Sequence, residues 1–156
     1  MALSKTDVRI LEQLQRDARM TNQTLADTLG LSPSPCWRKV RKLEEDEVIQ
    51  GYRAVLNRKK IGLSMMVFVC VTIDSHSEAE ARKFEAEVTA LDNVVACYSI
   101  GGDADFLLQV VAADMDRYAD FAMSVIRRLP GIKEMQSIFV LKEIKAQSAW
   151  PIQATD

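Results

Sequence analysis

Three segments within the first fifty residues carry apolar side chains every three or four positions, which is the spacing of an amphipathic helix. In the first segment, Val8, Leu11 and Leu14 form the apolar stripe, and Ser4 or Thr6 can cap the helix that carries them. The pattern therefore predicts a supporting helix close to the N-terminus.

Two shorter helices joined by a tight turn are predicted next, from Thr21 to Glu47. Thr21 or Asn22 can cap the first of them, and Gly30 supplies the left-handed residue that ends it. Ser32 is a suitable N-cap for the second helix, and the proline at the first helical position sacrifices no hydrogen bond there.

The outer face of the second of these helices is cationic. Four basic residues fall within five positions, and Arg38, Arg41 and Lys42 share one side of the helix. A short helix, a turn with glycine and a second helix with a basic outer face is an arrangement that places side chains in the major groove of DNA. The alternative is a solvated basic face on an ordinary helical hairpin, since runs of charge usually mark surface. The expected DNA-binding residues are Ser32, Ser34, Pro35, Arg38, Lys39, Arg41 and Lys42.

After the basic helix, residues 48–49 and 52–56 are predicted to form two short strands that pair as a small wing. The basic side chains of the polar turn that follows either contact phosphates or belong to a soluble linker. We expect a helix-turn-helix domain at residues 1–50, a wing strand and linker at 51–62, a second domain at 63–145 and a C-terminal tail at 146–156.

The hydrophobic pattern changes after Leu63 from helical spacing to alternation. The pattern predicts strands at residues 65–73, 94–100, 106–111 and 138–144, with helices at 78–91 and 114–128. The order βαββαβ is the ferredoxin-like arrangement, so the fold class is α+β. Both helices would cover one face of a four-stranded antiparallel sheet, and a second copy is the expected cover for the other face. The strand residues expected on that other face are among Val67, Val69, Val71, Val110, Phe139 and Leu141.

Charge is divided unevenly between the two halves of the chain. The formal net charge is −2 and the pI is near 5.5, which by themselves argue against a nucleic-acid partner. Residues 1–60, however, carry 12 basic and 8 acidic side chains, whereas residues 61–156 carry 8 and 14. DNA binding confined to the first third of the chain is consistent with this division.

Other chemistry finds little support in the sequence. The three cysteines are far apart and without metal-ligand spacing, so we expect reduced packing residues in a cytoplasmic protein. The only histidine, His76, is expected in a loop, and the aspartates between 103 and 120 fit turns and helix starts. No signal peptide or membrane span is expected. We therefore expect neither an enzyme nor a bound metal or cofactor.

Several ordered pieces of the sequence resemble the Lrp/AsnC family of bacterial and archaeal transcription regulators over nearly the whole chain. They are DVRILEQL at 7–14, LSPSPCWRKVRK at 31–42, residues 43–49, GDAD at 102–105, LPG at 129–131 and VLKEIK at 140–145. Glu47 departs from the glycine that many relatives have there. The resemblance implies that residues 63–145 bind an effector and form a homodimer through the open sheet face, with dimers assembling to an octamer.

The resemblance also implies a free amino acid bound between subunits against the hairpin. The matching positions are Ser99, Gly102, Asp103, Ala104, Asp105, Met135, Ser137 and Ile138. A glycine turn offers N–H groups to a carboxylate, and Asp103 or Asp105 can take an ammonium group. Met135, with Ile138 and Met115, favours leucine or methionine as the guest. The alternatives are residues that only pack the subunit junction, an architectural DNA binder without effector, and a stand-alone small-molecule sensor.

Overall fold

The chain, in a computed structural model that describes residues 2–74, 78–146 and 149–154, divides into two compact units. Unit 1 comprises Met1–Val55 and Ile144–Asp156, and unit 2 comprises Leu56–Glu143. His76 lies outside the described residues. Along the described ranges, no helix combines the length and apolarity that crossing a membrane requires.

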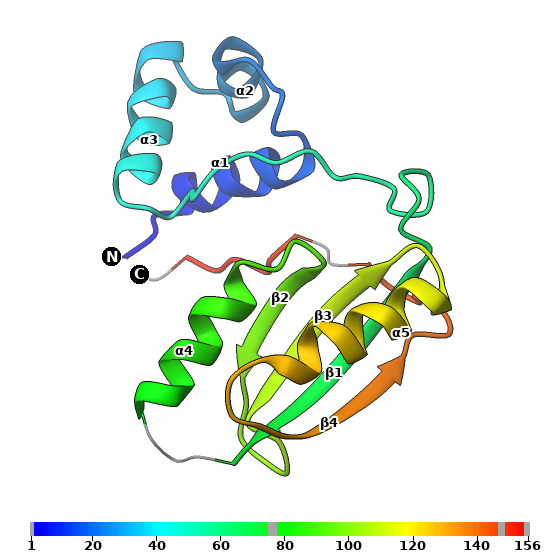
Figure 1. Cartoon of the computed structure of the whole chain (residues 1–156). Coiled ribbons are helices and arrows are strands. Elements are labelled where there is room, and N and C mark those ends of the chain that lie inside the picture. The colour runs from blue at the N-terminus through cyan, green and yellow to red at the C-terminus, as the bar shows by residue number, and fades with distance from the viewer. Residues whose placement is uncertain (1, 75–77, 147–148, 155–156) are drawn as a thin grey trace. The chain divides into compact units, whose positions relative to one another are not determined.

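Unit 1 contains three helices, α1 (Lys5–Arg16), α2 (Asn22–Leu29) and α3 (Pro33–Glu45) (Figure 1). The hydroxyl of Ser4 caps α1 by accepting from the Asp7 N–H at 3.2 Å, and Thr21 caps α2 by accepting from Thr24 at 3.1 Å. Gly30 ends α2 with a φ of 67°, so the predicted helix ends are confirmed here. The buried core of the unit is formed by Ile10, Leu11, Leu25, Ala26, Leu29, Cys36 and Leu43.

The predicted wing strands are wrong. No strand is formed between α3 and Met65, and residues 51–57 are all exposed. Val55 is 99% exposed and Leu56 is 65% exposed, so the apolar side chains that suggested strands have no sheet to pack against. A two-stranded ribbon needs such a surface to be stable, because isolated hairpins are marginal in water.

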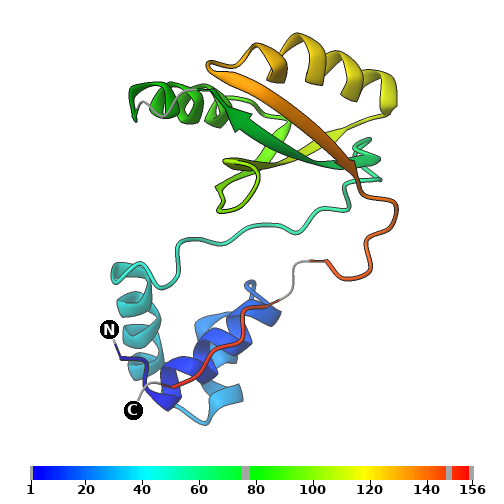
Figure 2. The ribbon, with the colours of Figure 1, turned by 90° about the horizontal axis from the view of Figure 1, so that it is seen from below.

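Unit 2 contains a four-stranded antiparallel sheet in the order β2-β3-β1-β4, as the βαββαβ pattern predicted. Figure 2 shows the helices α4 and α5 on the same face of this sheet. The elements are β1 (Met65–Ile73), α4 (Glu78–Thr89), β2 (Val94–Ser99), β3 (Phe106–Ala112), α5 (Met115–Ser124), the 3₁₀ turn Ile126–Arg128 and β4 (Ile132–Phe139).

The last strand and the last helix differ from their predicted bounds. β4 shares only residues 138–139 with the predicted strand at 138–144, and the apolar residues beyond it, Leu141 and Ile144, are strongly exposed. The sequence-based strand followed an apolar run, whereas pairing with β1 fixes the actual strand: Phe139 lies opposite Val67 and Met135 lies opposite Val71. The helix expected to continue to Arg128 gives way to the 3₁₀ turn after Val125.

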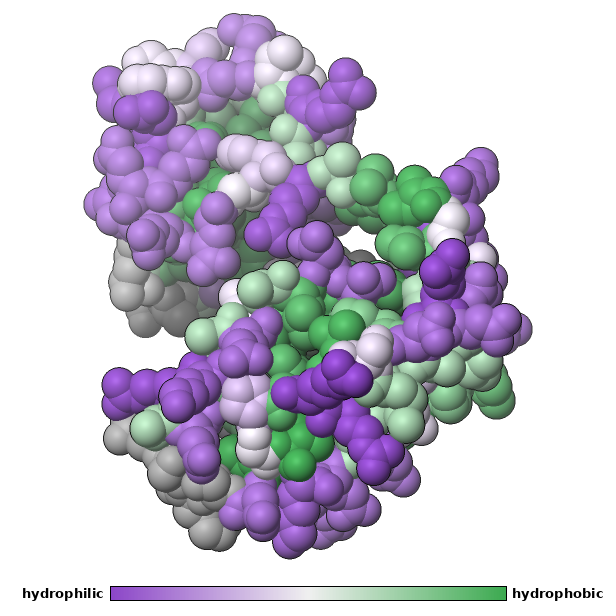
Figure 3. All heavy atoms as spheres, viewed as in Figure 1, coloured by the Kyte–Doolittle hydropathy of each residue, from purple (hydrophilic) through white to green (hydrophobic). Residues whose placement is uncertain are grey.

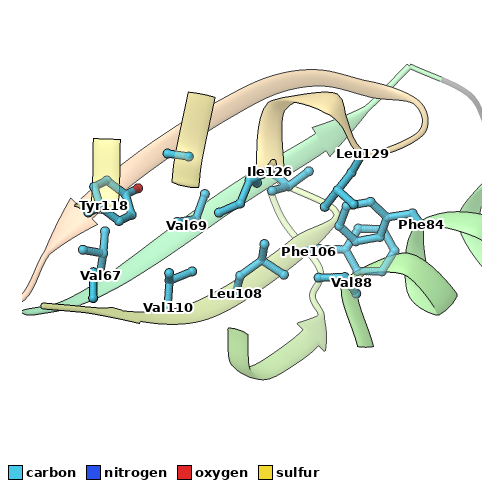
Figure 4. Close-up of a cluster of buried hydrophobic side chains, with 13 residues drawn as sticks. Val67, Val69, Phe84, Val88, Phe106, Leu108, Val110, Tyr118, Ile126 and Leu129 are labelled. Carbon is cyan, nitrogen blue, oxygen red and sulfur yellow. The ribbon is translucent and has the colours of Figure 1, made fainter. Parts of the chain in front are cut away.

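The core of unit 2 lies between the sheet and its two helices (Figure 4). Val67, Val69 and Val71 of β1 are fully buried in it, because alternate residues of a strand point to the same face. The Phe84 ring from α4 packs on that of Phe106 from β3, with centroids 4.5 Å apart.

The other face of the sheet is therefore not formed by the residues first expected. Of the six predicted positions, Val67, Val69, Val71 and Val110 point to the helices, and Phe139 packs edge-on against Tyr118 of α5. Leu141 lies beyond β4. The register places a different set on the open face, comprising Met66, Phe68, Cys70, Tyr98, Leu107, Gln109, Gln136 and Ile138. This face is still largely apolar, and no described helix of unit 2 covers it (Figure 2).

Candidate nucleic-acid interface and ligand hairpin

The first turn of α3 has few backbone donors, and this leaves the Ser32 hydroxyl without a capping role. An N-cap hydroxyl ordinarily accepts from the N–H two or three residues later. Pro35 occupies the third helical position and has no N–H, and the Ser32 side chain makes no capping hydrogen bond. Ser32, Ser34 and Pro35 are all exposed, so this end of the helix presents two hydroxyls to the outside.

The turn between α2 and α3 is fixed by two side chains. Asn22, in the first turn of α2, donates from Nδ2 to the carbonyl of Pro33 at 2.9 Å and so connects the starts of the two helices. Arg9 of α1 donates to the carbonyl of Leu29 at 3.2 Å, where α2 ends. These contacts hold α3 at a defined angle to its support, which a reading helix requires.

The outward face of α3 is a stripe formed by Ser34, Arg38, Arg41 and Glu45. These positions recur every three or four residues, opposite the buried Cys36 and Leu43. All four are exposed, and Figure 3 shows hydrophilic residues over most of the visible surface of this unit. The stripe is the part of unit 1 best placed to enter a groove of duplex DNA.

Arg41 has two neighbours that the sequence argument missed. Its guanidinium carbon lies 5.5 Å from the centroid of the Trp37 ring, and its Nη2 lies 3.6 Å from Glu45 Oε1. The side chains of Arg41 and Glu45 are 54% and 67% exposed, so the ion pair is weak and releases Arg41 easily. The i, i+4 spacing of Arg41 and Glu45 was the signal in the sequence.

Lys39 points away from the stripe and anchors α3 to α1. Its Nζ lies 2.8 Å from Asp7 Oδ1, and the same carboxylate accepts from the hydroxyl and N–H of Ser4 at 2.5 and 3.0 Å. Burial raises the pKa of Asp7, but the hydrogen bonds from Lys39 and Ser4 outweigh it and hold the pKa below the ordinary value. We assign Lys39 to this anchor, which leaves Arg38, Arg41 and Lys42 as the exposed cations of α3.

The Arg58 side chain is also engaged within its own segment. Its Nη1 donates to the carbonyls of Leu63 and Ser64, at 2.9 and 2.6 Å, and thereby stabilises the turn before β1. These contacts favour a linker over phosphate contact for Arg58.

The β2–β3 hairpin is tied to the end of β1 by Asp105. The Asp105 N–H donates to the Val71 carbonyl at 2.9 Å, and the Ile73 N–H donates to Asp105 Oδ2 at 2.8 Å. One oxygen of this carboxylate is therefore already occupied. Asp103, at the exposed tip beside Gly102 with its φ of 130°, is the better placed of the two to meet an ammonium group.

The predicted ligand residues do not gather at one point of a single chain. Ser99, Phe106, Val71 and Met135 form one row across the four strands, so Ser99 and Met135 are about 14 Å apart, three strand spacings. Ser99 instead lines a hollow of about 270 Å³ between α4 and β2. A free amino acid is too short to touch both ends of that row.

The remaining predicted positions are also dispersed. Ser137 is hydrogen-bonded to the hydroxyl of the buried Tyr118, on the helix side of the sheet. Ile138 is 48% exposed and lies on the open face, opposite Phe68. Met115 lies at the start of α5, beyond the end of β3 that is far from the hairpin, so it does not join Met135 within one chain. Ser137 on the helix side of β4 and Ile138 on its open face therefore cannot contact the same small ligand within one chain.

Within the three described ranges, no group of three His, Cys, Asp or Glu side chains is arranged to hold a metal ion.

Comparison with known proteins identifies relatives for both units. Residues 3–50 match the winged helix-turn-helix DNA-binding family, and residues 66–150 match the Lrp/AsnC ligand binding domain. The chain is 33% identical over 151 residues to the DNA-binding transcriptional activator DecR of Escherichia coli, covering 97% of this chain and 99% of that protein. It is 36% identical over 143 residues to the leucine-responsive regulatory protein of that species, covering 92% and 87%. A transcriptional regulator of Neisseria meningitidis, crystallised with L-Met, superimposes with a TM-score of 0.90 at 35% identity, covering 96% of each chain.

Proposed function

We propose, from the premise that this chain belongs to the Lrp/AsnC family of transcription regulators, that α3 reads a specific sequence of duplex DNA and that an apolar amino acid bound by unit 2 controls this reading. The chain is a DNA-binding regulator with a ligand domain, and not an enzyme. We place it in the cytoplasm, where DNA and free amino acids are both available. The outward stripe of α3 is the observation that carries the DNA-reading role.

Within the stripe, Arg38 is the residue proposed to read a base. It is exposed, central to the stripe and without the ion pair that engages Arg41. A guanidinium can donate two hydrogen bonds to the major-groove edge of guanine, which gives base discrimination. Arg41, Lys42 and the exposed hydroxyls of Ser32 and Ser34 are proposed to contact phosphates and base edges around it, with Pro35 in van der Waals contact.

Fluorescence anisotropy with genomic DNA fragments tests this assignment. Arg38→Ala should weaken specific binding by about 1–3 kcal/mol, because a base contact is lost. Arg127→Ala removes an exposed arginine from unit 2 and is the matched control. The proposal fails if the parent forms no complex at low salt, or if Arg38→Ala/Arg41→Ala binds DNA as tightly as the parent.

For unit 2, we propose that two copies together complete the amino-acid site. The N–H groups of the exposed Gly101-Gly102 turn would hold the carboxylate, and Asp103 the ammonium group. Met135 packs on the helix side of the sheet and Ile138 lies on the open face, so we propose that Ile138 of a second copy supplies the apolar wall. Leucine or methionine suits such a wall, and the relatives named for leucine and L-Met support this choice.

Thermal shift with each of the twenty amino acids tests this site. A ligand at about a hundred times its dissociation constant should stabilise unit 2 by roughly 2–3 kcal/mol. Methionine or leucine should give the largest shift, and Asp103→Asn should reduce it. A response to none of the twenty, or a preference for an acidic amino acid, would count against the proposed pocket and favour an architectural DNA binder.

We also propose that the open sheet face forms the homodimer, and that dimers assemble to an octamer. Its apolar side chains, including Phe68 and Tyr98, would otherwise present an extended apolar surface to water. Ile138→Lys places a charge on this face and should shift light scattering towards the monomer. Leu141→Lys is the control, because Leu141 is 97% exposed and lies outside the strands. A monomeric parent at micromolar concentration would refute this assembly.

A further inference from the structure

The C-terminal tail, residues 149–154, belongs to unit 1 although it follows unit 2 in the sequence. In Figures 1 and 2 this red segment runs along α1. The side-chain amide of Gln15 in α1 makes two hydrogen bonds to the main chain of Trp150. Its Nε2 donates to the Trp150 carbonyl at 3.1 Å, and the Trp150 N–H donates to its Oε1 at 2.6 Å. The Gln15 carboxamide thus pairs with the Trp150 main chain as the backbone of a neighbouring β-strand would, donating one hydrogen bond and accepting one.

The tail also contributes an apolar side chain to the core of unit 1. Ile152 is half-buried and packs against that core together with Leu14 of α1 and Ile49. Beside it, α1, the segment 47–53 and the tail line an open cavity of about 510 Å³. By contrast, Ile144, which precedes the tail, is 82% exposed. The contacts are therefore concentrated at Trp150 and Ile152.

We propose that residues 149–154 form a strap, clasped by Gln15 and closed by Ile152, that gives the DNA-binding unit a second connection to the ligand unit. The first connection is the chain between α3 and β1, of which residues 51–57 are exposed and form no regular structure. The second connection follows β4, the strand that carries Met135 and Ile138, and nine residues, 140–148, separate the end of β4 from the strap. With the strap seated on α1, unit 2 is joined covalently to unit 1 on both sides, before β1 and after β4.

The position of the strap on unit 1 indicates coupling and not blockage. Its hydrogen bonds are made to Gln15 of α1, and the cavity beside it is lined by α1, residues 47–53 and the strap, but by no residue of the outward stripe of α3. The strap therefore leaves the outward stripe of α3 accessible to DNA when it is bound to α1. We expect it to transmit the ligand state of unit 2 to the support of α3, an expectation that rests on the proposed amino-acid response.

Amide hydrogen exchange in the full chain tests the strap itself, without DNA or amino acid. The Trp150 N–H should be protected in the parent, and Gln15→Ala should raise its exchange rate about tenfold or more, because its acceptor is removed. Alanine suits a helix at least as well as glutamine, so α1 should persist. Gln153→Ala removes an exposed carboxamide from the strap and should leave the rate within about twofold of the parent.

Two results of this exchange experiment would overturn the strap. One is a parent Trp150 amide that exchanges as fast as an unstructured peptide. The other is protection that disappears when the protein is diluted until it dissociates, since the clasped segment would then come from a second copy.

DNA binding with and without the best amino acid tests the coupling. Ile152→Ala should leave affinity without amino acid within about twofold but reduce the amino-acid effect by at least about half. Ile144→Ala should change neither quantity. An amino-acid effect that survives unchanged in both Ile152→Ala and Gln15→Ala would refute the coupling. A parent with no amino-acid response would instead refute the proposed ligand function, while the exchange result would still decide whether the strap exists.

Discussion

Replacing Lys39 distinguishes a residue that anchors α3 from one that binds phosphate. In the folded chain the Asp7 side chain is 12% exposed and its carboxylate accepts from Lys39 Nζ at 2.8 Å. Lys39→Ala removes the cation and leaves this carboxylate with Ser4 alone. A hydrogen bond between charged groups contributes about 1.5–3 kcal/mol, and water at the 39% exposed Lys39 reduces it, so we expect unit 1 to lose about 1–2 kcal/mol.

The loss should depend on pH in a defined direction. The pKa of Asp7 is lower in the folded chain than its ordinary value of 3.8, so the folded state favours the ionised carboxylate. The stabilisation is therefore fully present above pH 3.8 and is lost as the pH falls through the folded-state pKa. Asp7→Asn should remove this part of the acid dependence, and Lys39→Ala should reduce it.

Tryptophan fluorescence during urea unfolding measures the effect, because both tryptophans, Trp37 and Trp150, belong to unit 1. Lys42→Ala is the matched control, because the Lys42 side chain is exposed and its removal should change the free energy of unfolding of unit 1 by less than about 0.5 kcal/mol. Its DNA affinity should instead show a salt dependence reduced by about one unit of slope. The reasoning is refuted if Lys39→Ala unfolds like the parent and reduces the salt slope as Lys42→Ala does.

Three further predictions follow from single residues. Glu47 has a φ of 55°, so Glu47→Gly should relieve about 1–2 kcal/mol of left-handed backbone strain, and the greater freedom of glycine in the unfolded chain should offset about 0.5–1 kcal/mol of that gain. Glu47→Ala retains the strain and should therefore not increase the free energy of unfolding measured in urea. Ser137→Ala leaves the buried Tyr118 hydroxyl without its hydrogen-bond partner, so it should destabilise unit 2 by about 1–3 kcal/mol and speed the hydrogen exchange of β1 amides. An equal destabilisation by the double variant Tyr118→Phe/Ser137→Ala, which removes both hydroxyls, would contradict this reasoning. Partial burial of the half-exposed Tyr52, together with the hydrogen bond to Glu44 and the Glu44 charge, raises the pKa of Tyr52 to about 12. The contribution of Tyr52 to stability is therefore present below pH 10 and lost as the pH rises through about 12, and Glu44→Gln should lower the pKa in a phenolate absorbance titration.

Local signals were sufficient for the helices of unit 1 and for the order of elements in unit 2. Thr21 and Gly30 act within a few residues of themselves, and a cap or a left-handed glycine has the same effect in most contexts. The fold class followed from the order of periodic segments, which needs no knowledge of contacts. The shared face of Arg38 and Arg41 followed for the same reason, because residues three or four positions apart are neighbours on any helix, although Lys42 was predicted there and Glu45 was not.

Signals that depend on a neighbouring element were misread from the sequence alone. The strand MMVFVCVTI is apolar at both odd and even positions, so its alternation could not show which residues face the helices. Pairing with β3 and β4 fixed that choice, and it also moved β4 away from the apolar run at 138–144. The wing residues were apolar but had no surface on which to pair.

The sequence by itself determined that this chain joins a three-helix unit with a basic outer face to a βαββαβ unit, because caps, helical spacing and alternation act over short distances. Only the tertiary structure decided that Lys39 is held by Asp7, that Ser99 and Met135 lie at opposite edges of the sheet, and that Trp150 returns to Gln15. Each of these contacts joins residues far apart along the chain, and their closeness depends on how whole elements pack, which no local pattern encodes.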